Sequence, residues 1–549
     1  ATGFDITLAN AANSLNGAVT FSGNNVSLTN NSATLLAASS ATGTLSVSAS
    51  GAITQNGPVT IGGNASLTAT DITLSNTGNT FGGTVGFTGA NVALFDSTAL
   101  ALDASSATGT LSAVSSAAIT QTGSLAVTGN AAFNGTKITL TNAANNFGNT
   151  VAFSGTDVAI TDSTELVLGA STAARGLTLV SGGNIYQTGE IKQGGGNTSG
   201  VVAISTPAGA STYLLLAGNQ FGTMRITTGS LYLKAIGVME ISDSTVGSYA
   251  DVSGMDSLYL LRNAFPGQGR FETSNGIYGD GNNFGYLRAV AGGTVDFFTT
   301  GSSIFGGLVD VQAREVILAA TGSITLNSLR AVSFARISST GDISQNNVSI
   351  LNDGPTYLTA TDDITLGYAS NILNGFVQAS GKNVTLATIG DLALDSITAS
   401  GSLTSSGTSI IQTSRSAMAI TGNATLNASK GDITLTNATN SFAGTVAFSG
   451  ANVSLTDSTP MSLAASSATG NMVLNSGGAL TQSGALTVGG TTAVNATGAD
   501  ITLTNAANSL AGAISFTGAN VALTNTKATI LAASNATGNL VVTSTNAIT

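Results

Sequence analysis

Apolar and polar residues alternate along most of the chain, in runs of only three to five residues. Examples are DITL at 5–8, LSVSA at 45–49 and PVTI at 58–61. These runs are rich in Val, Ile, Leu and Thr, and Gly, Asn or Ser separate them. A period of two positions is typical of β-strands with one buried face, and no stretch has a sustained helical period. The sequence therefore predicts short strands throughout, about eight in the first 66 residues.

The same block of sequence recurs along the chain. In each copy a large apolar residue, called an anchor here, is soon followed by Gly or Ala-Gly. Successive anchors lie 66, 66, 74, 84, 68, 69 and 68 residues apart. A fixed period of this kind indicates a repeat architecture rather than separate globular domains. The anchors are Leu15, Phe81, Phe147, Phe221, Phe305, Leu373, Phe442 and Leu510.

Strands this short do not make stable independent hairpins, but they can stack turn upon turn. With three strands per coil, one repeat gives about three coils of roughly 22 residues, and the chain about 25 coils. We therefore predict an all-β fold, a parallel β-helix, with Ile and Leu inward and Thr and Ser outward. The anchors are expected to form one inward row that returns every third coil. A string of antiparallel β-sandwiches fits less well because no linker is visible.

Composition narrows the possible functions. Charged residues make up 7% of the chain, the net charge is −11, and His and Cys are absent. The 15 basic residues form no run, which argues against nucleic-acid binding. Without His or Cys, most catalytic and transition-metal sites are excluded, so we expect no enzyme, no metal and no cofactor. No apolar run reaches the roughly 18 residues of a transmembrane segment. The chain opens on repeat sequence, so we expect an interior piece of a longer protein.

The repeat pattern loosens in the middle of the chain. We divide the sequence into regular repeats at 1–185, a divergent segment with insertion loops at 186–295, and regular repeats at 296–549. Seven of the nine Tyr lie between Tyr186 and Tyr286, and ten of the fifteen basic residues lie between Arg175 and Arg336. The extra length falls at 263–270 and 278–283, and insertions in solenoids often form the binding face.

Two interpretations of this segment remain open. Tyr and Arg offer aromatic faces and forked donors suited to sugars or acidic partners, which predicts a docking patch. Alternatively, the same side chains pin irregular loops against the shaft. The candidate binding residues are Tyr249, Tyr259, Arg262, Arg270, Tyr278, Tyr286 and Arg288.

Repeat segments such as DITLTN, GTVAFSG, LAASSATG and GGALTQSGALTVGG, between Asp432 and Gly490, resemble the central repeats of filamentous-haemagglutinin-like adhesins. These are bacterial exoproteins of the two-partner secretion type. The resemblance covers Asp5 to about Val180 and Asp363 to Thr549, and covers the middle poorly. It implies a right-handed, roughly triangular β-helix, export through an outer-membrane translocator, and an extracellular or cell-surface location.

Three functions follow as hypotheses. The first is a structural and adhesive shaft that mediates attachment to cells or matrix. Its partner would be a host or bacterial surface receptor, an extracellular polysaccharide or a second copy of itself. The second is a filament or sheath subunit that polymerises end to end through unpaired strand edges. The third is a polysaccharide-active β-helix enzyme, for which Asp251, Asp256, Arg262 and Arg270 are the only candidate groups.

Overall fold

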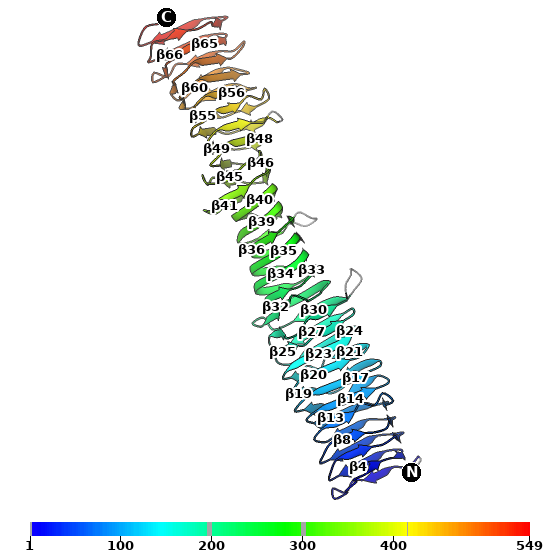
Figure 1. Cartoon of the computed structure of the whole chain (residues 1–549). Coiled ribbons are helices and arrows are strands. Elements are labelled where there is room, and N and C mark those ends of the chain that lie inside the picture. Colours follow the sequence, from blue (N-terminus) through cyan, green and yellow to red (C-terminus); the bar gives the residue numbers. More distant parts are fainter. Residues whose placement is uncertain (1–2, 195–199, 298–302, 414–415) are drawn as a thin grey trace. The chain divides into compact units, whose positions relative to one another are not determined.

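The computed structural model describes residues 3–194, 200–297, 303–413 and 416–549. Within these ranges the chain forms strands from β1 (Ile6–Leu8) to β69 (Leu540–Ser544) and no helix (Figure 1). Consequently, the described residues contain no helix that could span a membrane. Internal contacts divide the chain into two compact units, Ala1–Ser274 and Asn275–Thr549.

Alternate residues of each strand are buried, as the two-residue period predicts. In β4 (Val26–Asn30), Val26, Leu28 and Asn30 are buried, whereas the two residues between them are only partly covered. β7 (Leu45–Ala49) repeats the pattern with Leu45, Val47 and Ala49 inward. Burial of the branched apolar side chains supplies the main favourable free energy of folding, because it removes apolar surface from water.

The strands pair in parallel, each with the strand about one turn later. β4 pairs with β7, β7 with β10 (Ala65–Thr68), and β10 with β13 (Thr84–Gly89). The register partners are Val26 and Leu45, Leu45 and Ala65, and Ala65 and Val85, so one turn takes 19 or 20 residues. We call such a series of paired strands a column.

These pairings confirm the predicted all-β parallel solenoid. The structure has about 28 turns rather than the expected 25, because each turn is shorter than the roughly 22 residues assumed from the sequence.

A 66-residue repeat is not a whole number of 20-residue turns. β14 (Val92–Asp96) is the copy of β4 one repeat later, yet it lies in another column. β4 leads through β7 and β10 to β13, whereas β14 follows β5 (Thr34–Leu36), β8 (Ile53–Gln55) and β11 (Ile72–Leu74). In the first unit, therefore, successive copies of one motif occupy different columns.

The anchors show the same displacement, and the expected single row is wrong. Phe81 and Phe147 are both 1% exposed, so their predicted burial is correct. Phe81 belongs to a separate four-stranded sheet, whereas Phe147 lies in the large sheet. Phe81 is in register with Ile61, Ala41 and Gly23, and Phe147 with Val127, Ala107 and Gly89.

Side-chain size increases along each of these columns. Both run from Gly through Ala and a branched residue to Phe. In the second unit Gly381, Ala399, Ile420 and Phe442 form the same series. A Cβ on Gly23 would lie 2.9 Å from the Phe4 carbonyl oxygen, so only Gly fits there. Because protein interiors are close-packed, the room beside the column must widen over three turns until Phe fills it.

A reciprocal amide pair is repeated through both units. In each pair the Gln Nε2 donates to the Asn Oδ1 and the Asn Nδ2 donates to the Gln Oε1, at 2.7–2.9 Å. The Asn always lies two residues before an anchor and is fully buried. Before Phe305, Ser303 occupies this position instead. The pairs are Gln55–Asn79, Gln121–Asn145, Gln187–Asn219, Gln345–Asn371, Gln412–Asn440 and Gln482–Asn508.

We expect Asn145→Ala to lower the free energy of unfolding by about 2 to 3 kcal/mol, because it leaves buried polar groups without partners. Asn145 Oδ1 also accepts the Leu125 N–H at 2.9 Å, and both this group and the Gln121 amide would be orphaned. The neighbouring Asn146 is exposed, so Asn146→Ala should change the value by less than about 0.5 kcal/mol. Denaturant unfolding measures both, and equal effects would contradict the structural role of the pair.

Candidate functional site in the divergent middle

Four of the tyrosines in the first unit form a row in which the first three rings are stacked and the fourth is tilted by 40° to its neighbour. They come from β28 (Ile185–Gln187), β31 (Ser211–Leu214), β32 (Thr223–Lys234) and β34 (Thr245–Leu261). The ring centroids are 5.0 Å apart for Tyr186 and Tyr213, 4.7 Å for Tyr213 and Tyr232, and 5.5 Å for Tyr232 and Tyr249. The faces of the middle rings therefore lie against their neighbours. The stacking of these rings stabilises the column.

The predicted arginines of the first unit are held by carboxylates. Arg270 in β35 (Ala264–Asp280) lies 3.2 Å from Asp251 and 3.2 Å from Glu272. Arg262 binds Asp243 with two hydrogen bonds of 2.8 and 3.0 Å. The hydrogen bond from Arg262 lowers the pKa of the Asp243 carboxyl below its ordinary value. Asp243 and Arg262 have φ values of 48° and 53°, so both lie at left-handed corners of the chain.

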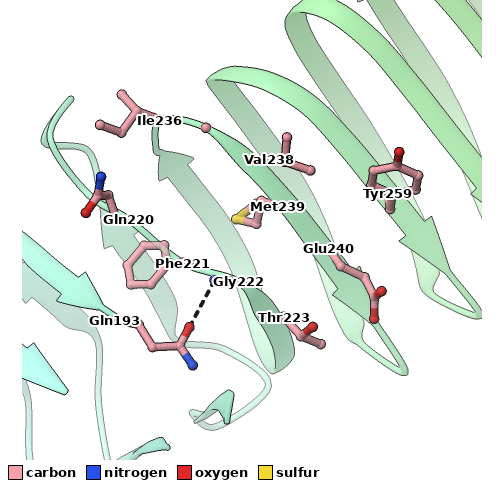
Figure 2. Close-up of a pocket in the computed structure, with 11 residues that line it drawn as sticks. Gln193, Gln220, Phe221, Gly222, Thr223, Ile236, Val238, Met239, Glu240 and Tyr259 are labelled. Carbon is pink, nitrogen blue, oxygen red and sulfur yellow. Dashed lines mark hydrogen bonds between the residues drawn. The ribbon is translucent and has the colours of Figure 1, made fainter. Parts of the chain in front are cut away.

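A hollow of about 600 Å³ lies in the first unit. Its wall combines exposed apolar side chains with amides and a carboxylate (Figure 2). Ile236, Val238 and Tyr259 are 43%, 59% and 40% exposed. The lining residues are Gln193, Gln220, Phe221, Gly222, Thr223, Ile236, Gly237, Val238, Met239, Glu240 and Tyr259.

One substitution in the repeat alters the backbone beside this hollow. The column Gly155, Ala173, Gln193 matches Gly89, Ala107, Val127 one repeat earlier, so Gln193 replaces a branched apolar residue. In the regular repeat Gly148 N–H donates to the Val127 carbonyl at 2.7 Å. Here Gly222 N–H donates to Gln193 Oε1 at 2.9 Å, the dashed bond in Figure 2. A side chain thus takes the place of a main-chain acceptor next to Phe221.

A second substitution removes a polar contact from the same place. The Ser163 N–H donates to the Asn145 carbonyl, and the Ile236 N–H donates to the Asn219 carbonyl in the same way one repeat later. The residue before Ile236, Ala235, therefore occupies the position that Asp162 has in the previous repeat. The Phe147 N–H donates to Asp162 at 3.3 Å, and the methyl group of Ala235 offers no such acceptor. Two changes that remove regular contacts therefore flank Phe221, at the edge of the hollow.

Of the candidate residues predicted in the first unit, Tyr259 lines the hollow, whereas Tyr249, Arg262 and Arg270 do not. Gln193, Val238 and Glu240 line it and were missed. Gln193 had a usable signal, since a polar residue interrupts a column that is otherwise apolar. Val238 and Glu240 gave no such signal in the sequence. Their place in the wall of the hollow depends on the turn length and not on their residue types.

The three remaining candidates lie in the second unit. Tyr286 in β36 (Asn283–Ala291) donates its hydroxyl to Asp310 in β39 (Leu308–Ala320). Asp310 also accepts from Asn327 at 2.9 Å and from Ser328 at 2.6 Å. Arg288 is exposed and lies opposite Asp310 in the strand register, and Tyr278 lies opposite Asp296. Among the described residues, no cluster of acidic side chains suited to a metal ion is found.

Burial and the hydrogen bond to Asp310 raise the pKa of the Tyr286 phenol to about 12. The folded protein therefore favours the protonated phenol, and this contribution to stability is lost as the pH rises through about 12. Asp310→Asn should shift the late step in a tyrosinate absorbance titration toward the ordinary pKa. Tyr286→Phe, as control, should abolish that step, and its persistence in Tyr286→Phe would contradict the assignment.

Comparison with known proteins places most of the chain in one family. The family model "Repeats of unknown function (DUF5649)" matches residues 23–88, 89–154, 155–228, 313–380, 381–449 and 450–517. These segments cover well over half of the chain and leave 229–312 between the third and fourth matches. The comparisons with curated proteins and with solved structures give no match. The chain is therefore a β-solenoid protein that belongs to the DUF5649 repeat family.

Proposed function

We propose that this chain is the structural and adhesive shaft of a large bacterial surface or secreted protein, of the filamentous-haemagglutinin-like kind. The repeats provide a stiff spacer, because within each unit successive described turns hydrogen-bond to one another and pack their apolar residues together. The divergent middle provides the attachment surface. Extracellular polysaccharide is the partner we favour, and the outer-membrane translocator of two-partner secretion is the export route.

One observation carries the attachment proposal. The hollow lies where the regular repeat fails, and residues 236–240 and Tyr259 in its wall belong to the segment that the family model does not match. An aromatic ring, neutral amides and one carboxylate in a shallow apolar hollow are suited to a sugar chain, which offers both C–H faces and hydroxyl groups. Exposed apolar side chains grouped in this way are typical of interaction sites.

The proposal assigns no catalysis to the chain. A polysaccharide-active enzyme would need its charged groups to converge on one substrate, whereas two of the four candidates pair with each other and the other two bind separate partners. Arg270 contacts Asp251, Arg262 contacts Asp243, and Asp256 accepts from Ser274 at 3.3 Å. These contacts support an arrangement of local ion pairs rather than an active site.

The double variant Val238→Ser with Tyr259→Ala tests this function. It should weaken binding of the purified protein to the polysaccharide of the producing cells by roughly tenfold or more, as loss of a central contact does. Its unfolding temperature should stay nearly unchanged, because both side chains are substantially exposed. The measurement is retention on immobilised polysaccharide, with intact cells as a second surface.

Val473→Ser is the matched control, since Val473 in β59 (Met472–Ser476) is 38% exposed within a regular repeat. It should bind as the unaltered protein does. Equal loss for both variants, or unchanged retention of the double variant, would refute the assignment of the hollow. Binding to a second copy of the chain in place of polysaccharide would favour self-association instead.

A further inference from the structure

One buried position recurs fifteen residues after six of the eight anchors and carries different polar residues in different repeats. Asn occupies it after Leu15 and Leu510, Asp after Phe81, Phe147 and Phe442, and Thr after Leu373. Every one of these side chains is buried. The repeats thus offer a natural comparison of Asn with Asp in one site. The residues are Asn30, Asp96, Asp162, Thr388, Asp457 and Asn525.

Where the residue is Asn, it satisfies both main-chain groups of its anchor. Asn525 Oδ1 accepts the Leu510 N–H at 2.9 Å, and its Nδ2 donates to the Leu510 carbonyl at 3.0 Å. Asn30 does the same for Leu15, at 2.9 and 3.1 Å. The side-chain atom that faces the carbonyl oxygen of the anchor is Nδ2 of the Asn. This atom must be a hydrogen-bond donor.

At two of the three Asp residues, Asp96 and Asp457, the second carboxyl oxygen has no hydrogen-bond partner. Asp457 Oδ1 accepts from the Thr459 N–H at 2.9 Å, the Thr459 hydroxyl at 2.8 Å and the Phe442 N–H at 3.3 Å. Its Oδ2, the counterpart of the Asn525 Nδ2, is buried without a hydrogen bond. Asp96 likewise binds Thr98 through Oδ1 and leaves Oδ2 buried and unpaired.

We propose that Asp96 and Asp457 are neutral carboxylic acids in the folded solenoid, and that each donates its Oδ2 proton to the carbonyl of its anchor, Phe81 or Phe442. A carboxylate there would place a buried negative charge against a carbonyl oxygen, which is strongly unfavourable. The neutral acid has one O–H donor and makes the bond that Asn makes in the other repeats.

The surroundings of both carboxyl groups agree with this assignment. Burial raises the pKa of Asp96 and of Asp457 above the ordinary value, although the hydrogen bonds from Thr98 or Thr459 oppose it. The strand that pairs on the C-terminal side places Ser115 beside Asp96 and Ser476 beside Asp457. On the N-terminal side the Ser97 N–H donates to the Asn79 carbonyl at 2.9 Å and the Ser458 N–H to the Asn440 carbonyl at 2.7 Å, which places Asn79 beside Asp96 and Asn440 beside Asp457. No charged side chain is among the described groups that set either pKa.

Asp162 marks the limit of the proposal. It occupies the same position, but its Oδ1 accepts from Thr164 and its Oδ2 accepts the Phe147 N–H at 3.3 Å. Both oxygens thus have donors. The proposal therefore concerns Asp96 and Asp457 only.

The sign of the pH dependence follows from the raised pKa values. An acid whose pKa is higher in the folded than in the unfolded chain stabilises the fold fully below its unfolded pKa. That stabilisation is lost as the pH rises through the folded pKa. The two sites therefore loosen the contact between successive turns as the medium becomes alkaline, one site in each unit.

Infrared spectra of the full chain test the protonation directly. At neutral pH the unaltered protein should show the C=O stretch of a neutral carboxyl group, and Asp96→Asn with Asp457→Asn should remove it. Asn is the native residue at this position in two repeats, so the variant should fold. Its denaturant midpoint should exceed that of the unaltered protein at mildly alkaline pH and change less with pH.

Asp500→Asn is the control. Its exposed carboxyl accepts from the N–H groups of Asn520, and these bonds lower its pKa, so it contributes no neutral acid. This variant should leave the infrared band in place. A band that is absent from the unaltered protein, or that survives in the double variant, would overturn the proposal, as would a double variant less stable at alkaline pH.

Discussion

The structure depends on the parallel hydrogen-bond register between successive turns. Each strand is too short to be stable alone, and it is held because its main-chain groups pair with strands about one turn before and after it, a spacing of 19 or 20 residues in the column that contains Leu45. This spacing decides which side chains meet in a column. It thereby decides where a Phe has room, where only Gly fits, and where a buried amide finds its partner. The amide pairs and the graded columns are consequences of that register.

The repeat length and the turn length are different quantities, and the difference shapes the surface. Because 66 residues make about 3.3 turns of 20, a motif such as Val26–Asn30 returns as Val92–Asp96 in another column. Identical sequences therefore do not build identical rows along one side. A change in one repeat alters one column locally, as Gln193 does beside Phe221. Function can thus arise in the divergent segment while the rest remains scaffold.

The fold class could be predicted because two features that indicate it are visible in the sequence itself. These are the alternation of apolar and polar residues in runs such as LSVSA and the recurrence of whole blocks. Burial of Phe81 and Phe147 was also predictable, since large apolar residues in short strands have no other stable place. The columns in which these two residues lie were not predictable, because the length of the sequence repeat does not determine the number of residues in one turn. In the middle, Tyr and Arg stood out by type, yet Tyr213 stacks and Arg262 pairs with Asp243. The hollow is formed largely by ordinary residues, such as Val238, whose positions only the register reveals.

The 20-residue register is the central claim, and engineered cysteines test it directly because the chain has no Cys of its own. Ser46 and Ser66 are exposed register partners on neighbouring strands, about 4.8 Å apart by strand spacing and within the range that a disulfide spans. Under mild oxidation, Ser46→Cys with Ser66→Cys should form an internal disulfide rapidly. Ser46→Cys with Thr68→Cys, the pair expected for a 22-residue turn, should remain reduced. Preferential oxidation of the second pair would contradict the register and the column assignments that depend on it.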